Sequence, residues 1–567
     1  MADEKESGTA EGCGKRWFSP DRRVVTMVAA IVVLAGALRV VRLGQSPPGL
    51  NQDEAANAWN AYCLLKTGRD QVGVRWPIFY SRCLGENRST LFFYYLIPFQ
   101  VIGGLDIWTL RFAAAVGGIA AVLLTYLVGA RLFGRPVGLM SAAFLAVNPW
   151  HVQLTRWGHE ASLGPLLVLL PLALGLWAGL PLGDKPGRSR PVVAFFAGIM
   201  GGVLCYGYPA VRLFLPAFAV AVVVINWRAW GEYLKSRGNV MAAGAAILGA
   251  GLTFGALAVK HLTDPNIGKR GQTMWVWAPS DSTATKVGKV VRRYAGHFGP
   301  DFLFVQGDHS ELHSPPGFGE FHWYMAPLMG VGLVAAIGRA RTSRSGRVLL
   351  AWIALYPVGD CIAHHGSASV LRSAPGLPGL IMLAGLGAIV AGGFLFKRWR
   401  RIALCVTGAF LIAVVILNVR FLHFFFGPYN RLTWPYHGFN IDLLEACDWL
   451  KPRFQDVDAV FCTVESMNQP YIITLVALDY DPRQWFRDKR QVLSMIWDYY
   501  GRYGKVHFMY GNIWLGDFQR LLKNGRRDRV VFILRPDEAQ GLKLRNPTLR
   551  ITRPDGLVVL EVYAVYL

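Results

Sequence analysis

The chain has 567 residues, of which 53% are apolar, 13% aromatic and only 17% charged. This composition excludes a string of ordinary soluble domains and is typical of a polytopic membrane protein. The net charge of +23 does not indicate nucleic-acid binding, because Lys and Arg stand in short clusters between apolar runs, as they do in cytoplasmic loops.

A basic N-terminus is followed by the first apolar run. Four Lys and Arg residues at positions 15–23 precede an apolar run over residues 24–41, and no small-residue cleavage site follows it. A signal peptide would end in such a site. We therefore expect residues 1–23 to form a cytoplasmic tail and the run to be retained as the first membrane helix.

Eleven apolar runs of roughly 15 to 22 residues are long enough to be membrane helices. They cover residues 24–41, 110–130, 137–150, 162–180, 192–208, 211–227, 240–259, 321–337, 348–361, 377–396 and 402–421. A twelfth candidate, Leu91–Gly103, is shorter and contains a proline.

The distribution of Lys and Arg decides between eleven and twelve spans, because cytoplasmic loops are enriched in these residues. With eleven spans, 16 of them fall in loops on the side of the N-terminus, and the short loops of the other face hold or border three. Counting Leu91–Gly103 as a span would invert this pattern. We therefore expect an all-α polytopic membrane protein with about 11 transmembrane helices, in which Leu91–Gly103 is an interfacial or re-entrant helix.

Three long segments then lie on the non-cytosolic face: a first outer loop over residues 42–109, a large outer loop over 260–320, and the chain after residue 421. The third alternates a helix-like stretch with short β-rich runs. These are residues 441–450, then 459–464, 505–510, 529–534 and 557–567. We expect a membrane domain over residues 24–423 and an extracytoplasmic α/β domain over residues 424–567.

Two adjacent carboxylates, Asp53 and Glu54, stand near the start of the first outer loop. Asn51 or Asp53 can cap a helix over residues 55–67 that stops at Gly68. Both carboxylates then lie at the positive end of a helix dipole and remain ionised. One interpretation is a capped helix lying flat in the headgroup layer, and the other is a catalytic site, which requires partners.

Further acids and cations fall on the same face by the topology alone. Glu86 precedes the interfacial helix, and Glu160 lies in the second outer loop beside His159. Isolated acids beside a membrane are ordinarily solvated. Acids opposite several cations instead suggest an anionic substrate handled by acids and bases together. The cations are Arg88, Arg156 and Arg372.

The large outer loop is basic, although outer segments are ordinarily poor in positive charge. Its Lys and Arg residues either bind phosphates or belong to a solvated loop near anionic lipid. They are Lys260, Lys269, Arg270, Lys286, Lys289, Arg292 and Arg293. Nearby histidines and acids indicate a metal site only weakly, because their spacing is common by chance. These are His297, His309, His313, Asp308 and Glu311, and His364 and His365 beside Asp360.

The eight cysteines form no C-x-x-C pair and show no Cys/His spacing of the zinc type. Two pairs, Cys63 with Cys83 and Cys447 with Cys462, fall in outer segments, where a disulfide is permitted but not required.

Four segments resemble the C-type (GT-C) membrane glycosyltransferases, the family of protein O-mannosyltransferases, oligosaccharyltransferases and the bacterial lipid A aminoarabinose transferase. They cover residues 47–59, 84–99, 110–134 and 148–163. The resemblance implies that the first-loop acid, here Asp53 with Glu54 beside it, is the general base. It also places the family's other outer acids on Glu86 and Glu160.

One departure concerns the phosphate of the donor. The aminoarabinose transferase type follows its acid with a Lys that contacts this phosphate, whereas here Asn87 takes that place and Arg88 comes next. Phosphate binding would then be shared among Arg88, Arg372 and the basic loop, including Lys269 and Arg270. Arg156 and His159 complete the expected substrate-binding set.

The resemblance implies transfer of a sugar from a polyprenyl-phosphate donor to a protein, lipid or glycan acceptor on the non-cytosolic face, with inversion. Cationic side chains or a divalent cation would stabilise the departing phosphate. We expect metal independence, because no compact cluster of acids is visible in the sequence. The Asn87-Arg88-Ser89 sequon lies in the expected site, where a glycan would obstruct it, and this favours a bacterial inner membrane.

Two other classes remain as alternatives. A transporter or flippase for a lipid-linked or anionic substrate would place ionisable groups near the middle of the membrane, whereas these spans are almost free of charge. A scaffold whose outer domain binds a partner would give the acidic set no purpose.

Overall fold

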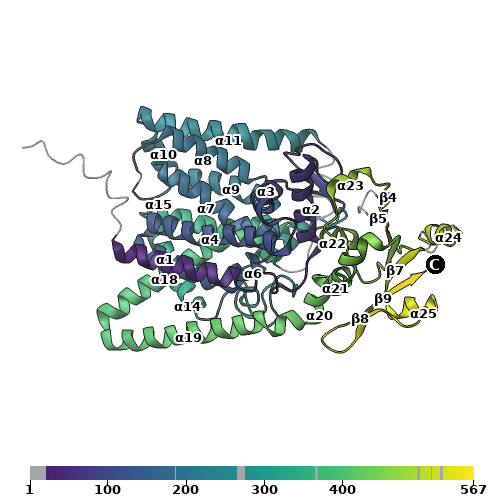
Figure 1. Ribbon diagram of the computed structural model, residues 1–567. Helices are drawn as coiled ribbons and strands as arrows, with labels where there is room; N and C mark the ends of the chain where they lie inside the picture. The colour runs from purple at the N-terminus through teal and green to yellow at the C-terminus, as the bar shows by residue number, and fades with distance from the viewer. Residues whose placement is uncertain are drawn as a thin grey trace, which may run out of the picture.

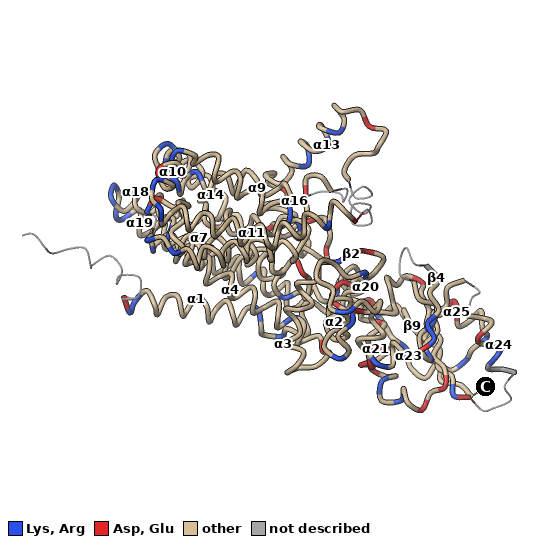
Figure 2. The backbone as a smooth tube through the Cα atoms, turned by 90° about the horizontal axis from the view of Figure 1, so that it is seen from above, with Lys and Arg blue, Asp and Glu red and all other residues tan. Residues whose placement is uncertain are grey.

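The computed structural model describes residues 21–185, 187–264, 275–363, 368–494, 499–511, 514–523 and 528–566. Figure 1 shows a bundle of long helices with a mixed α/β domain at one end. We call the end that carries this domain the outer end. Lys and Arg gather at the opposite end of the bundle (Figure 2), as the positive-inside interpretation requires. The orientation in the membrane stays a prediction.

All eleven apolar runs are helical. The helices are α1 (Arg22–Val40), α4 (Ile107–Phe133), α5 (Arg135–Val147), α7 (Gly164–Trp177), α8 (Pro191–Leu204), α9 (Pro209–Ile225), α11 (Arg237–Thr263), α14 (Met325–Ala340), α15 (Arg344–Leu355), α18 (Leu377–Arg398) and α19 (Arg400–Phe426).

Length and composition allow six helical segments among the described residues to cross a membrane, which makes the chain a multi-pass membrane protein. A seventh crossing is possible if α9 and α10 (Trp227–Tyr233), bent by 78°, form one span. Several of the remaining helices are apolar but shorter. The count of eleven spans therefore remains a prediction.

Small residues let pairs of bundle helices approach closely. A Cβ atom at Gly198 of α8 would lie 2.0 Å from the carbonyl oxygen of Ala246 in α11. One at Gly387 of α18 would lie 1.8 Å from that of Leu328 in α14. Because lipid tails are as apolar as the helices, such close packing is what holds membrane helices together.

The first outer loop folds into helix α2 (Gln52–Thr67), a hairpin of β1 (Ser81–Cys83) and β2 (Glu86–Arg88), and helix α3 (Leu91–Gly103). Helix α2 begins three residues earlier than expected, because Asn51 and Glu54 form a capping box. It ends where Gly68 takes the left-handed conformation, with φ of 67°.

The α/β domain contains one seven-stranded sheet of order β4-β5-β6-β3-β7-β9-β8. Its strands are β3 (Ala459–Cys462), β4 (Gln491–Ser494), β5 (Tyr499–Tyr503), β6 (Val506–Phe508), β7 (Arg529–Leu534), β8 (Leu549–Thr552) and β9 (Val558–Tyr566). Strands β6, β3 and β7 are parallel, and the outer pairs are antiparallel. The four β-rich runs seen in the sequence are β3, β6, β7 and β9, whereas β4, β5 and β8 were not expected.

Alternate residues of the central strands face two helical layers, as the period of a strand requires. Val460 and Ile533 pack in the core shared with helices α21 (Ile441–Leu450) and α22 (Pro470–Ala477). Phe461 and Phe532 face helices α24 (Leu515–Lys523) and α25 (Pro536–Gly541). Helix α23 (Pro482–Arg487) lies next to α22.

Helix α2 is enclosed between the bundle and the α/β domain, which differs from the interpretation of a helix lying on an open surface. Trp59 is fully buried and packs edge-to-face on Trp485, with ring centroids 6.0 Å apart. The indole of Trp485 also donates to the carbonyl oxygen of Gln71 at 2.9 Å. The outer domain therefore holds α2 in place.

The cysteine pairs are not bridged in the structure. Cys63, Cys83, Cys447 and Cys462 are all buried free thiols.

Candidate active site

Three acids that are far apart in the sequence meet around one arginine at the outer end of the bundle. Arg88 donates a hydrogen bond from Nη2 to Oδ1 of Asp53, which lies in the first turn of α2. The Arg88 guanidinium also lies 3.7 Å from a carboxylate oxygen of Glu160 and 3.9 Å from one of Glu86. We call Asp53, Glu86, Arg88 and Glu160 the acidic cluster.

The β1–β2 hairpin sets which side chains reach the cluster. Cys83 and Glu86 are paired, and the two residues between them, Leu84 and Gly85, have φ of 56° and 74°. This is the two-residue turn with positive φ that matches the twist of a hairpin. Because side chains alternate along a strand, Glu86 and Arg88 share one face and Asn87 takes the other. The resemblance predicts a Lys directly after the acid Glu86. Here the cation is Arg88, one residue later, and it lies on the same face of the strand as Glu86.

The acidic cluster is mostly buried, and its Asp53 and Glu86 side chains are partly exposed to water. The side chains of Arg88 and Glu160 are 7% and 10% exposed, whereas those of Asp53 and Glu86 are 23% and 28% exposed. Burial raises the pKa of Asp53, but the Arg88 guanidinium, with the neighbouring His159, outweighs it and leaves that pKa below its ordinary value. Asp53 is therefore ionised at neutral pH.

Arg88 has donors left for a ligand. Its Nε and Nη1 atoms are buried and have no hydrogen-bond partner among the described residues. Buried donors nearly always have a hydrogen-bond partner in a folded protein. Two such donors without one, beside the partly exposed Asp53, suggest a place where an oxygen of a ligand could bind.

Glu54 has a different environment from its neighbour Asp53. It is fully buried, and its two oxygens accept from the Nε and Nη2 atoms of Arg111, each at 2.8 Å. It also accepts from the backbone nitrogens of Gly158, at 2.8 Å, and Asn51, at 3.2 Å. Arg111 donates onward to the carbonyl oxygen of Pro47 at 2.7 Å. These contacts argue against the predicted catalytic role of Glu54.

His159 points its Nε2 atom toward the cluster. Its Nδ1 accepts from the backbone nitrogen of Ala161 at 3.0 Å, so the ring proton belongs on Nε2, which lies 3.8 Å from Asp53. The amide of Asn57, one turn after Asp53 on α2, donates to Glu160 at 3.0 Å. Sequence reasoning missed Asn57, although the i, i+4 spacing from Asp53 places both on one face of the helix.

Arg156, expected to contact substrate, is committed to the fold. It donates to the carbonyl oxygens of Ser46, Leu38 and Arg42 at 2.8 to 3.1 Å, and its guanidinium lies over the ring of Phe426. The other predicted cations, Lys269 and Arg270, lie outside the described residues, as do His364 and His365.

A cavity of about 450 Å³ adjoins the acidic cluster. His159, which lies 3.8 Å from Asp53, packs on the lining residue Tyr208 with ring centroids 6.0 Å apart, and Trp157 packs on the lining residue His313 at 5.4 Å. The cavity is lined by Tyr208, Asp308, His309, Ser310, Glu311, Leu312, His313, Ser369, Leu371, Arg372 and Trp434. Tyr208 and Trp434 were not predicted, because apolar runs and loops both contain many aromatic residues.

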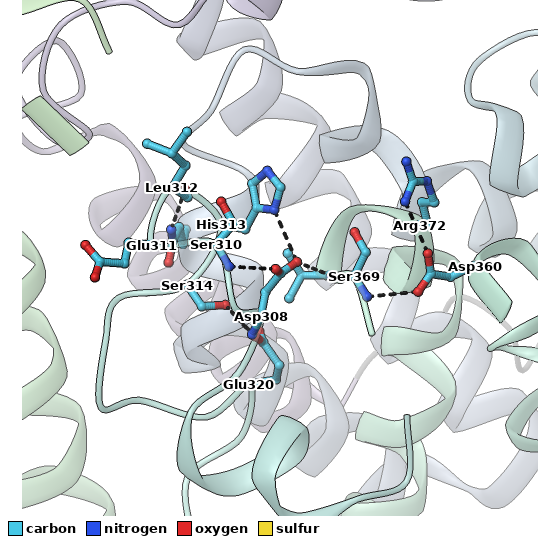
Figure 3. Close-up of polar contacts among 12 residues, drawn as sticks. Asp308, Ser310, Glu311, Leu312, His313, Ser314, Glu320, Asp360, Ser369 and Arg372 are labelled. Carbon is cyan, nitrogen blue, oxygen red and sulfur yellow. Dashed lines mark hydrogen bonds and ion pairs between the residues drawn. The ribbon is translucent and has the colours of Figure 1, made fainter. Parts of the chain in front are cut away.

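Two carboxylates fix the wall of this cavity (Figure 3). Asp308 accepts from His313 at 3.1 Å and from the backbone nitrogens of Ser310 and Val370, each at 3.0 Å. Burial raises the pKa of Asp308, but its contacts with His313 prevail and leave it below the ordinary value. Asp308 is therefore ionised and holds His313 at the cavity.

Asp360 holds the cation of the same wall. It accepts from Arg372 at 3.4 Å and from the backbone nitrogen of Ser369 at 2.9 Å (Figure 3). Arg293 and His297 contact the same carboxylate at 3.2 and 3.0 Å. The Arg372 side chain is 22% exposed and also lines the cavity, so its pairing with Asp360 does not bury it completely.

Glu320 is a buried acid that contacts the wall of the cavity through the backbone nitrogen of Asp308. Burial raises the pKa of this carboxyl well above its ordinary value. Its Oε1 accepts from the hydroxyl of Ser314 at 2.5 Å and from the backbone nitrogen of Asp308 at 3.0 Å. Within the part of the chain that the structure describes, no group of three or more His, Cys, Asp and Glu side chains is arranged to hold a metal ion.

The helical bundle, the outer-loop helices α2 and α3 and the outer α/β domain together form the fold expected from the resemblance to the C-type (GT-C) membrane glycosyltransferases. No protein-family model and no curated protein matches the chain. The structural likeness is to ArnT from Cupriavidus metallidurans, in the crystal structure bound to undecaprenyl phosphate. The two chains are 15% identical, with 96% of this chain and 98% of ArnT covered and a TM-score of 0.52.

The chain is also similar to two other solved structures. ArnT from Cupriavidus metallidurans in the apo state gives the same identity and coverage, with a TM-score of 0.50. The Archaeoglobus fulgidus oligosaccharyltransferase, tethered to an acceptor peptide, is 13% identical, with 82% of this chain and 64% of that chain covered and a TM-score of 0.49. The expected GT-C fold is confirmed by the match to ArnT.

Proposed function

We propose that the protein is a membrane glycosyltransferase that moves a sugar from a polyprenyl-phosphate donor to a protein, lipid or glycan acceptor on the non-cytosolic face. The observation that carries this proposal is the acidic cluster, in which an ionised, partly exposed Asp53 lies beside a cavity walled by Arg372. The fold supports it, because the similar ArnT structure is described as bound to undecaprenyl phosphate.

Asp53 is the proposed general base. An ionised carboxylate can accept the proton of the acceptor nucleophile as the new glycosidic bond forms, in a single displacement that inverts the anomeric carbon. Arg88 and the Nε2 proton of His159 hold this carboxylate from two directions. The amide of Asn57 donates to Glu160 and fixes the position of this second acid in the site.

Departure of the lipid phosphate requires positive charge near the leaving oxygen. We assign this role to the unpaired donors of Arg88 and to Arg372 in the adjoining cavity. Lys269 and Arg270 remain proposed contacts from the large outer loop. Because a guanidinium can supply this stabilisation by itself, the proposed reaction requires no divalent cation.

The rival functions fit the site less well. A transporter or flippase needs its ionisable groups along a path through the membrane, whereas α2, whose first turn carries Asp53, lies at the outer end of the bundle (Figure 1). A scaffold would not require an ionised carboxylate beside unpaired buried donors. The orientation with the N-terminus in the cytoplasm, in a bacterial inner membrane, is part of the same proposal.

Gene deletion and complementation test this function. Mass spectrometry of cell-envelope glycans should show a glycan that is lost on deletion and restored by the wild-type chain. The variant Asp53→Asn should not restore it, although it is expressed at the wild-type level. The matched control is Asp106→Asn, which changes an exposed outer-loop acid that caps α4 and can still cap as Asn. Full restoration by Asp53→Asn would remove Asp53 from the mechanism.

A further inference from the structure

A second cavity lies at the end of the bundle opposite the α/β domain, which we call the inner end. It is walled by the end of α4, the loop between α7 and α8 and the turn between α14 and α15. Arg347 of α15 donates to Asn226 at the start of α10 at 2.7 Å, and Figure 1 shows α10 at this end. The inner cavity has a volume of about 450 Å³, which lies within the range of small-molecule sites.

Three cations from three different elements line the inner cavity. They are Arg131 of α4, Lys185 of the α7–α8 loop and Arg339 of α14. The side chains of Lys185 and Arg339 are exposed and form no hydrogen bond or ion pair with any residue in the described part of the chain. Because like charges repel, cations gathered around one space favour an anion between them.

Other charges at the inner cavity do not cancel these cations. Of the described lining residues only Asp184 is acidic, and its carboxylate accepts from the hydroxyl of Ser343 and the backbone nitrogen of Arg344, each at 2.6 Å. This acid therefore holds the loop on the N-terminus of α15. At Gly134, where α4 ends and α5 begins, the two helix ends carry opposite partial charges. The cavity is left with an excess of positive charge.

An exposed apolar row of α4 leads to the inner cavity. Leu123 and Leu127 are 39% and 47% exposed, and Arg131 follows at the same four-residue spacing, so all three lie on one face of the helix. Helix α4 is long and apolar enough to cross a membrane, where exposed leucines contact acyl chains. A lipid whose chain packs on this row would have its headgroup at Arg131.

We propose that the inner cavity binds the phosphate group of an anionic phospholipid, with an acyl chain along Leu123 and Leu127. Arg and Lys bind phosphate through charge-assisted hydrogen bonds, and basic pockets between membrane helices bind lipid headgroups in this way. A free phosphate would use the same cations, but it would have no contact with the exposed leucines that lead to them. The convergence of three cations on one cavity distinguishes this position from the general positive charge of the inner loops.

Native mass spectrometry of the full-length protein tests this site. The protein is released from nanodiscs that contain equal amounts of phosphatidylglycerol and phosphatidylcholine, and the lipids that it retains are identified. The variant Lys185→Gln/Arg339→Gln removes two cations of the cavity. The matched control, Arg237→Gln/Arg341→Gln, removes two exposed cations at the same end that do not line it.

We expect the wild type to retain phosphatidylglycerol in preference to phosphatidylcholine. The Kd for phosphatidylglycerol should rise by about tenfold or more in the cavity variant and by less than about twofold in the control. An equal rise in both variants would show a general attraction of lipid to the basic end. Retention of the two lipids without preference would show that the headgroup is not recognised. Either result overturns the proposal.

A competition arm distinguishes a lipid from a free anion. Inorganic phosphate should displace the retained phosphatidylglycerol no more than chloride does at the same ionic strength. Stronger displacement by phosphate would show that the cavity binds the free anion, which overturns the assignment to a lipid.

A variant that keeps both charges controls for folding. Lys185→Arg/Arg339→Lys should keep the preference for phosphatidylglycerol, and its unfolding temperature, followed by tryptophan fluorescence, should equal that of the wild type. Loss of the preference at an unchanged unfolding temperature would contradict a site that recognises charge. No arm measures glycosyl transfer, so this proposal and the proposed function can fail separately.

Discussion

Two neighbouring carboxylates of α2 each pair with an arginine from another element, Asp53 with Arg88 of β2 and Glu54 with Arg111 of α4, and the two pairs differ in what surrounds them. Glu54 and Arg111 are fully buried, and backbone groups satisfy their remaining hydrogen-bonding capacity. Asp53 is partly exposed, and two buried donors of Arg88 have no hydrogen-bond partner among the described residues. Residue type and sequence position are thus the same for the structural pair and for the pair that we propose takes part in catalysis. The saturation of their hydrogen bonds is what differs.

The sharpest test of this difference is the loss of the reactive carboxylate. Asp53→Asn keeps the shape and one hydrogen bond to Arg88 but removes the base. We expect the rate of sugar transfer to fall by about 10² to 10⁴-fold, while the temperature of unfolding is unchanged. The rate is measured in nanodiscs and unfolding by tryptophan fluorescence. A large loss of stability with normal transfer would assign Asp53 to the structural class.

Removing the structural cation should have the opposite outcome. Arg111→Met leaves Glu54 charged and buried without its partner, and we expect the free energy of unfolding to fall by about 3–5 kcal/mol. Replacing both residues, as Arg111→Met/Glu54→Met, should recover part of this loss, because no unpaired charge is then buried. Denaturant unfolding in detergent compares the two variants. Wild-type stability of Arg111→Met would contradict the buried pair.

The reactive pair should also control the pH dependence of transfer. Asp53 has a pKa held below its ordinary value of 3.8, so the wild-type rate should fall only at strongly acidic pH. In Arg88→Gln the burial that raises this pKa is less opposed, and the acid limb of kcat/KM should move toward neutral pH. The exposed Arg75→Gln in the same loop is the control and should leave the profile in place. An unmoved acid limb in Arg88→Gln would separate Arg88 from Asp53.

The smallest effect is expected at a third carboxylate, Glu320, because Gln has the same shape and can accept the same hydrogen bonds. Its pKa is raised in the folded state, so the wild-type protein loses stability as pH rises above the ordinary value of 4.5. Glu320→Gln should remove this pH dependence. At about pH 8, the unfolding temperature of the variant should equal or exceed that of the wild type. Destabilisation as large as that of Glu320→Ala would show that the acid is ionised.

The sequence predicted most of the helical frame because apolar length and charge asymmetry are local signals. Leu91–Gly103 is helix α3 with the bounds expected, and Gly68 ends α2 as expected. Likewise, four of the sheet strands were found as β-rich runs. The remaining strands were missed because β4 and β8 are only four residues long and β5 contains a glycine.

The candidate site was predicted only in part. Topology alone placed Asp53, Glu86 and Glu160 on one face, but it could not show that Arg88 lies among them. The fate of Glu54 was not predictable from its neighbours, because its partner Arg111 is 57 residues away. A signal was nevertheless present: an arginine at the start of an apolar run is costly unless it is paired.

The hairpin that carries Glu86 and Arg88 limits how this site can change. The two side chains share a face because they are two residues apart on a strand closed by a two-residue turn. A substitution at position 86 or 88 changes the charge of the side chain but not the face of the strand from which it projects. An insertion or deletion of one residue in the turn would instead rotate the whole strand by one register and exchange Glu86 and Arg88 for Asn87. New specificities at this site can therefore arise by exchange of side chains, whereas changes in loop length would remove the cation and the acid together.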